Sequence, residues 1–140
     1  MNHKALPLIT QSDELLALTA PKPEQRDCSC TLKNATGWSS VSETDWPKQL
    51  HAVASLQDPE VYEPSFEEYH PSGTRYDSPQ APIALGFFPS NRCTVYACSQ
   101  CHRYALRYTE FGGYYVDPRA RLLNPLLIVQ AAAPKPAKEP

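Results

Sequence analysis

The sequence contains few glycines and no cluster of basic residues. Its five glycines are scattered along 140 residues, so it lacks the glycine-rich loops that bind the phosphate groups of nucleotides. Thirteen Lys and Arg residues against fifteen Asp and Glu residues give a formal net charge of −2. Without a basic block, the chain has no simple electrostatic basis for non-specific binding to nucleic acid or anionic membranes. A basic partner fits this charge better.

Long apolar runs are also missing. The most apolar stretch, LLNPLLIVQAAA, is interrupted by Asn124 and Pro125 and falls short of the roughly 20 apolar residues that span a bilayer. The N-terminal stretch MNHKALPLITQSDELLALTA carries Asp13 and Glu14 where a signal peptide needs its apolar core. We therefore expect a soluble, cytoplasmic protein.

Proline is the residue type in excess. Fifteen prolines and a mean hydropathy of −0.48 leave fewer residues for regular elements than an average domain has. The length corresponds to a single domain, which we assign to residues 1–130, followed by a disordered tail at residues 131–140. Because the core of such a chain is small, an additional cross-link would stabilise it.

Two segments have the pattern of helices. Residues 11–20 predict a short helix that is capped by Ser12 and ends before Pro21. A second, longer helix is expected over residues 45–56. Its apolar residues follow helical spacing at Trp46, Leu50, Val53 and Leu56.

The second half of the chain has the pattern of strands. Residues 92–97 predict a strand, and Gly112-Gly113 between two aromatic runs predicts a β-hairpin. With both glycines in a two-residue turn, Tyr108 would face Asp117. Residues 120–130 fit either a short helix or a strand. The predicted fold class is therefore a small α+β domain with two or three helices and a short antiparallel sheet that ends in the Gly-Gly hairpin.

The cysteines are the candidate metal ligands. An odd number of cysteines, five, in a reducing compartment argues against a disulfide framework. Two pairs, Cys28-x-Cys30 and Cys98-x-x-Cys101, supply the four thiolates of a closed tetrahedral zinc site. A strand that ends in Cys-Ser-Gln-Cys-His lets the chain turn back so that both sulfurs converge, while backbone amides donate to them. We predict a structural Zn²⁺ that staples the domain.

Other ligand sets and other uses of the cysteines stay open. Cys93 could replace Cys28 or Cys30, and His70 or His102 could also serve as a ligand. Ordinary buried thiols and a redox Cys-x-x-Cys pair are the alternatives to metal binding. A closed four-thiolate site has no open position for water or substrate, and the sequence offers no oxyanion-hole motif beside a nucleophile. We therefore expect no enzymatic activity.

The segment from Asp58 to Asp77 combines acids with prolines and aromatics. A disordered linker would be poor in aromatics, so we expect this segment to wrap an ordered core. It supplies the candidate contact surface for a protein partner: Glu63, Glu67, Glu68, Tyr69 and Asp77. The hairpin offers an alternative surface that could stack on single-stranded nucleic acid. Its residues are Arg103, Tyr104, Arg107, Tyr108, Tyr114 and Tyr115.

The stretch NRCTVYACSQCHRYALRYTEFGGYYVDPRARLL, residues 91–123, resembles small, mostly uncharacterised bacterial proteins in which a Cys-x-x-Cys precedes an LRYTE-GGYYVD-like hairpin. The similarity includes YEPSFEEYHPSGTRY, residues 62–76, and the Cys-x-Cys. Proteins of this size and style resemble immunity proteins, the accessory partners of secreted bacterial toxins. The resemblance implies a module that binds and neutralises a cognate toxin. A zinc-ribbon-like nucleic-acid-binding regulator is the alternative.

Overall fold

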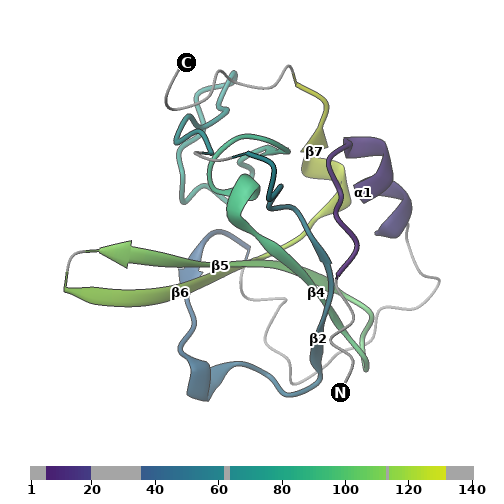
Figure 1. Ribbon diagram of the computed structural model, residues 1–140, viewed down its shortest axis with the longest axis vertical. Coiled ribbons are helices and arrows are strands. Elements are labelled where there is room, and N and C mark those ends of the chain that lie inside the picture. Colours follow the sequence, from purple (N-terminus) through teal and green to yellow (C-terminus); the bar gives the residue numbers. More distant parts are fainter. Residues whose placement is uncertain (1–5, 20–35, 62–63, 113, 132–140) are drawn as a thin grey trace.

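The computed structural model describes residues 6–19, 36–61, 64–112 and 114–131, which form a mostly β structure (Figure 1). These ranges contain one α-helix, three 3₁₀ helices and seven strands. The helices are α1 (Ser12–Leu18), η2 (Glu43–Asp45), η3 (Ser90–Arg92) and η4 (Pro125–Leu127). The strands are β1 (Ser39–Ser40), β2 (Leu50–Ser55), β3 (Ile83–Ala84), β4 (Thr94–Cys98), β5 (Tyr104–Gly112), β6 (Tyr115–Leu122) and β7 (Ile128–Val129).

Five of the strands form one antiparallel sheet in the order β1-β6-β5-β4-β2. Its centre is the meander β4-β5-β6, in which each strand pairs with the next one in the sequence. β3 and β7 form a separate parallel pair. Figure 1 shows that β5 and β6 continue together as a ribbon well beyond the other strands. The outer half of this ribbon is two-stranded because β4 pairs only with residues 104–107 of β5.

The sheet buries apolar residues on both faces. The paired residues Val95 and Leu106 belong to the larger core, which also contains Leu15 of α1. The adjacent pair, Tyr96 and Ala105, belongs to a smaller cluster on the opposite face. Successive residues of a strand point to opposite faces, so this pair of strands separates the two cores.

The predicted α+β fold with two or three helices is wrong. The segment expected to form the longer helix contains η2 and β2, and β2 pairs with β4. The pairing shifts register between Ala52 and Ala54, as at a β-bulge, and a bulge changes the face on which the following residues lie. Leu50 therefore joins the smaller cluster while Ala54 and Leu56 join the larger core. Burial on alternate sides of a bulged strand imitates the spacing of an amphipathic helix.

The hairpin is confirmed, but its predicted register is wrong. Gly112 pairs with Tyr115 at the end of the ribbon, and Tyr108 lies opposite Arg119 instead of Asp117. Some two-residue hairpin turns need glycine at only their first central position. A Gly-Gly pair therefore does not fix which two residues turn. Because the shift along β6 is two residues, Asp117 and Arg119 still lie on the same face of the ribbon as Tyr108.

Two local predictions are confirmed. The short N-terminal helix is α1, which ends at Leu18 ahead of Pro21, and the strand predicted at residues 92–97 is β4. The predicted cap is wrong: Ser12 lies inside α1 after Gln11, no side chain caps the helix, and the Ser12 hydroxyl donates to Gln130. The ambiguous segment 120–130 contains the end of β6, then η4 and β7. Of the predicted tail, residues 132–140 lie outside the described part of the chain.

Candidate functional site

The turn between β4 and β5 has the geometry expected of half a metal site. The backbone amides of Gln100 and Cys101 donate to the sulfur of Cys98 at 3.4 and 3.5 Å. The turn closes where the amide of His102, whose φ is +62°, donates to the carbonyl of Cys98 at 3.0 Å. Cys98 and Cys101 are 1% and 0% exposed. N–H groups that donate to sulfur favour the thiolate, which is the form that binds metal.

The other two predicted ligands, Cys28 and Cys30, lie outside the described residues. Within the described ranges, no group of three or more His, Cys, Asp and Glu side chains is arranged to hold a metal ion. The four-cysteine site therefore stays a prediction. His102 is exposed beside Cys101. Both ring nitrogens of His70 are hydrogen-bonded, at 2.8 Å to Glu68 and at 2.7 Å to Thr74.

Cys93 lies in a different environment from the Cys98–Cys101 turn. It is fully buried in the larger core, where its thiol donates to the carbonyl of Pro89 at 3.1 Å. Burial raises the pKa of this thiol well above its usual value, against the smaller effects of Arg121 and Arg92. Cys93 is therefore a neutral core thiol in this structure.

An aromatic cluster holds the acidic segment against the sheet. The ring of Tyr76 stacks on Trp38 with centroids 6.1 Å apart, and Trp38 meets Tyr108 edge-on at 5.0 Å. Phe88 also contacts Tyr108 edge-on, at 5.8 Å. Rings in offset-stacked and edge-to-face arrangements add about 0.5–1.5 kcal/mol per pair beyond the area that they bury. Tyr76 thereby anchors the end of the segment to β5.

Hydrogen bonds extend this anchor to β6 and β1. The hydroxyl groups of Tyr76 and Tyr108 are hydrogen-bonded to each other, and Arg119 donates to Tyr76 at 3.2 Å. Arg119 also donates to Asp117 at 2.9 Å, and Ser40 donates to the same oxygen at 2.8 Å. Burial raises the pKa of both tyrosines, whereas the hydrogen bonds from Arg119 and Ser40 lower the pKa of Asp117.

Further anchors lie near the middle of the acidic segment. The amide of Phe88 donates to the carbonyl of Glu67 at 2.8 Å, and the ring of Tyr69 lies 5.1 Å from that of Phe87. Beyond the segment, the buried Arg121 donates to the carbonyls of Pro79 and Ala81 at 3.3 and 3.2 Å. The expected wrapping of an ordered core by this segment agrees with these contacts.

The anchors leave most of the predicted contact residues facing solvent. Glu67, Glu68 and Asp77 are exposed, and Tyr69 is half-buried against Phe87. Glu63 lies outside the described residues. The structure thus presents three of the five predicted contact residues as exposed acids on one fixed segment.

The projecting hairpin exposes large apolar side chains near its tip. Phe111 and Val116 face each other across the ribbon, and their side chains are 77% and 63% exposed. Tyr114 in the turn is fully exposed. Nearer the body, the guanidinium of Arg107 lies over the ring of Trp46 at 4.3 Å, and Tyr108 is buried. Because Arg107 and Tyr108 are engaged in packing within the protein, these contacts do not favour the predicted stacking of the hairpin on nucleic acid. That surface stays a prediction.

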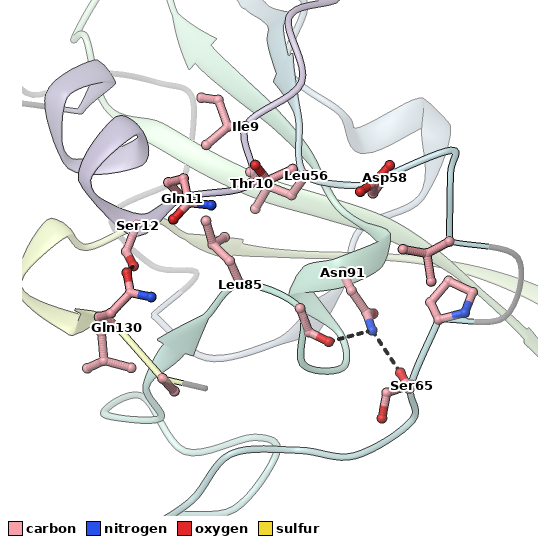
Figure 2. Close-up of a pocket in the computed structure, with 15 residues that line it drawn as sticks. Ile9, Thr10, Gln11, Ser12, Leu56, Asp58, Ser65, Leu85, Asn91 and Gln130 are labelled. Carbon is pink, nitrogen blue, oxygen red and sulfur yellow. Dashed lines mark hydrogen bonds between the residues drawn. The ribbon is translucent and has the colours of Figure 1, made fainter. Parts of the chain in front are cut away.

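A cavity of about 400 Å³, which the sequence did not reveal, lies between α1 and the acidic segment (Figure 2). Its described walls come from six parts of the chain: residues 9–12; 56, 58 and 61; 64 and 65; 85 and 86; 91; and 129–131. No motif joins these stretches, because only the tertiary structure brings them together. Within the sequence, the only local hint of this cavity is the carboxylate of Asp58, two residues after the apolar Leu56.

Comparison of the chain with models of protein families, with curated protein sequences and with solved structures gives no match. The resemblance to immunity proteins therefore stays a prediction from the sequence. Among the helices of the described ranges, none is long and apolar enough to cross a membrane.

Proposed function

We propose that this protein is a binding module that recognises a basic protein partner through the segment from Asp58 to Asp77. In the favoured form of this proposal it is a cytoplasmic immunity protein that neutralises a bacterial toxin. The observation that supports the proposal is the exposure of Glu67, Glu68 and Asp77 on a segment whose backbone is fixed by buried anchors.

Fixed anchors matter because binding has an entropic cost. A contact surface that is already ordered loses less conformational freedom when the partner binds. Negative charges on such a surface attract a basic partner and accelerate association. The partner would therefore present lysine or arginine side chains, as a nuclease or another enzyme with an anionic substrate does around its active site.

We also propose that a structural Zn²⁺ stabilises the protein. Cys98 and Cys101 would supply two thiolates, and Cys28 and Cys30 would supply the others. The amide-to-sulfur hydrogen bonds at Cys98 support this proposal. A site closed by four thiolates would contribute stability and no catalysis.

The test of partner binding begins with capture of the partner on the purified protein and its identification by mass spectrometry. Affinity is then measured by titration calorimetry for the double variant Glu67→Lys/Glu68→Lys. We expect a loss of about tenfold or more, since two favourable charges become repulsive. Asp13→Lys/Glu14→Lys, which reverses two exposed adjacent acids of α1, is the matched control and should have a smaller effect. Equal affinity of Glu67→Lys/Glu68→Lys and the wild type would exclude this segment from the interface.

The immunity role has its own test. Cells that produce the captured partner should stop growing, and co-expression of the wild-type protein should restore growth. Co-expression of Glu67→Lys/Glu68→Lys should restore it less well at the same protein level. Growth that is unaffected by the partner would contradict the immunity role and leave a binding module of another kind.

The zinc proposal is tested by elemental analysis of purified protein. We expect one zinc per chain in the wild type and in Cys93→Ala, and a loss of most zinc in Cys98→Ser and Cys101→Ser. Cys93→Ala is the matched control because it removes a buried thiol outside the Cys98–Cys101 turn. Absence of stoichiometric metal from the wild type would overturn the proposal.

A further inference from the structure

The cavity beside the acidic segment is walled mainly by apolar side chains. Leu56 and Leu85, which Figure 2 labels, contribute to its walls together with Val61 and Val129. Its volume of about 400 Å³ falls within the range of about 300–1,000 Å³ that is typical of ligand pockets. It is large enough for an extended side chain.

The polar side chains of the cavity include hydroxyl and amide groups and one carboxylate, that of Asp58. Among the described residues of its walls, only Asp58 carries a charged side chain. One oxygen of this half-buried carboxylate accepts from the amide of Glu60 at 2.9 Å, and no cation in the described part of the chain pairs with it. Asn91, which is 7% exposed, donates to the carbonyls of Ser65 and Gly86. Its own side-chain oxygen is buried and has no hydrogen-bond partner within the described ranges.

From this arrangement we infer that the cavity receives an arginine side chain of the protein partner. The aliphatic part of arginine would lie against Leu56 and Leu85, since long cationic side chains cover apolar surface with their stems. The guanidinium would donate to the carboxylate of Asp58, whose geometry matches its planar fork.

The inference rests on the proposed function, because the arginine belongs to the partner. Asp58 begins the acidic segment, so the cavity and the exposed acids would contact the same partner. Arginine side chains that fill pockets near an interface often dominate binding energy. The exposed acids would then attract the partner, and the cavity would hold it.

A small-molecule titration tests the cavity without the partner. The probe is N-acetyl-arginine N-methylamide, followed by ¹H–¹⁵N NMR on the full chain. We expect shifts in the amide resonances of residues around the cavity, such as Leu85 and Gly86. The citrulline analogue, which has nearly the same shape without the charge, should bind about tenfold more weakly. The leucine analogue should also bind more weakly than the arginine probe.

Variants locate the binding. Asp58→Asn should abolish the preference for arginine over citrulline, whereas Asp45→Asn, at an exposed acid of η2, should retain it. Val61→Trp, at a position that is 42% exposed, should weaken all probes by filling the cavity without disturbing the core. Equal binding of the arginine and citrulline analogues, tightest binding of leucine, or a preference that survives Asp58→Asn would overturn the inference.

The partner complex provides the last comparison. Asp58→Asn should weaken it about tenfold, and Asp45→Asn should leave it unchanged. If the arginine probe does not bind while Glu67→Lys/Glu68→Lys still weakens the complex, the cavity assignment fails and the proposed function stands. If Glu67→Lys/Glu68→Lys and its control Asp13→Lys/Glu14→Lys both bind the partner as tightly as the wild type does, the proposed role of the acidic segment in binding is excluded. This conclusion does not depend on the probe titration.

Discussion

Three buried cysteines show how strongly the neighbours of a residue decide its chemistry. Cys93 is enclosed by apolar groups and donates its own proton to a carbonyl, whereas Cys98 accepts from two amides in a tight turn. Burial without donors favours the thiol, and amide donors favour the thiolate. The same residue type therefore serves as core packing at one end of β4 and is suited to metal binding at the other.

Asp117 gives a prediction at the residue scale. Its pKa is lower in the folded protein because Arg119 and Ser40 donate to it. A carboxyl with a lowered pKa stabilises the fold above its unfolded pKa, about 3.9, and this stability is lost as the pH falls towards the folded pKa. Asp117→Asn should therefore be less stable than the wild type near neutral pH and should lose less stability on acidification.

Urea unfolding between about pH 2 and pH 7 measures this difference. Ser40→Ala, which removes one of the two donors, should show a smaller change in the same direction. Parallel loss of stability in the wild type and Asp117→Asn as the pH falls would show that the carboxylate contributes nothing to the fold.

At the scale of elements, the acidic segment has little regular structure and depends on side-chain anchors. Tyr76→Ala removes the ring that stacks on Trp38 and the hydroxyl that bonds to Tyr108 and Arg119. We expect amide hydrogen exchange to rise across residues 64–79, while the amides of β4, β5 and β6 stay protected. Local opening of this kind is typical of regions with few backbone hydrogen bonds in regular elements.

Tyr76→Phe is the matched variant, because it keeps the ring and loses only the hydroxyl. Its cost should be about 1 kcal/mol, the usual net value of a hydrogen bond, and exchange in the segment should change little. Uniform exchange across the whole protein in Tyr76→Ala would mean that the segment and the sheet unfold as one unit.

The hairpin gives a second prediction for an element. The double variant Phe111→Ala/Val116→Ala should change the free energy of unfolding by less than about 1 kcal/mol, since substitutions of exposed residues typically cost within about 0.5 kcal/mol each. Leu106→Ala, on the same strand at a fully buried position, should cost about 2–5 kcal/mol. Urea unfolding distinguishes the two. A similar cost for the tip and for Leu106 would show that the tip packs against another surface in solution.

At the scale of the whole molecule, the proposed metal would account for a large share of stability. Structural zinc contributes an apparent ~10–16 kcal/mol in small peptides, which is comparable with the whole stability of an ordinary domain. Removal of metal with a chelator should therefore lower the midpoint of thermal unfolding by more than about 10 °C. The same treatment should leave Cys98→Ser, which has already lost the metal, unchanged. An unaltered wild-type midpoint after chelation would contradict a structural role.

Local patterns were sufficient where neighbouring residues decide the structure. The acids and leucines of α1, the apolar residues of β4 and the glycines between two aromatic runs each predicted their element, because helix signals, β-propensity and turn chemistry act over a few residues. The cap predicted at Ser12 does not form, since that hydroxyl donates to the distant Gln130 instead. The Cys-x-x-Cys turn with amide donors to its sulfur was also foreseeable for this reason. The predicted helix at residues 45–56 failed because the burial of Leu50 and Leu56 depends on which face of β4 lies beside each.

The sequence by itself determined the hairpin, the short first helix and the acidic character of the segment from Asp58 to Asp77. Only the tertiary structure decided that β2 is a strand, that Tyr76 anchors that segment by stacking on Trp38, and that Asp58 and Asn91 border one cavity. The physical reason is the separation along the chain of the residues that interact. Turns and short helices are set by adjacent residues, whereas strand pairing and cavity walls join residues that are distant in the chain and become neighbours only when the sheet forms.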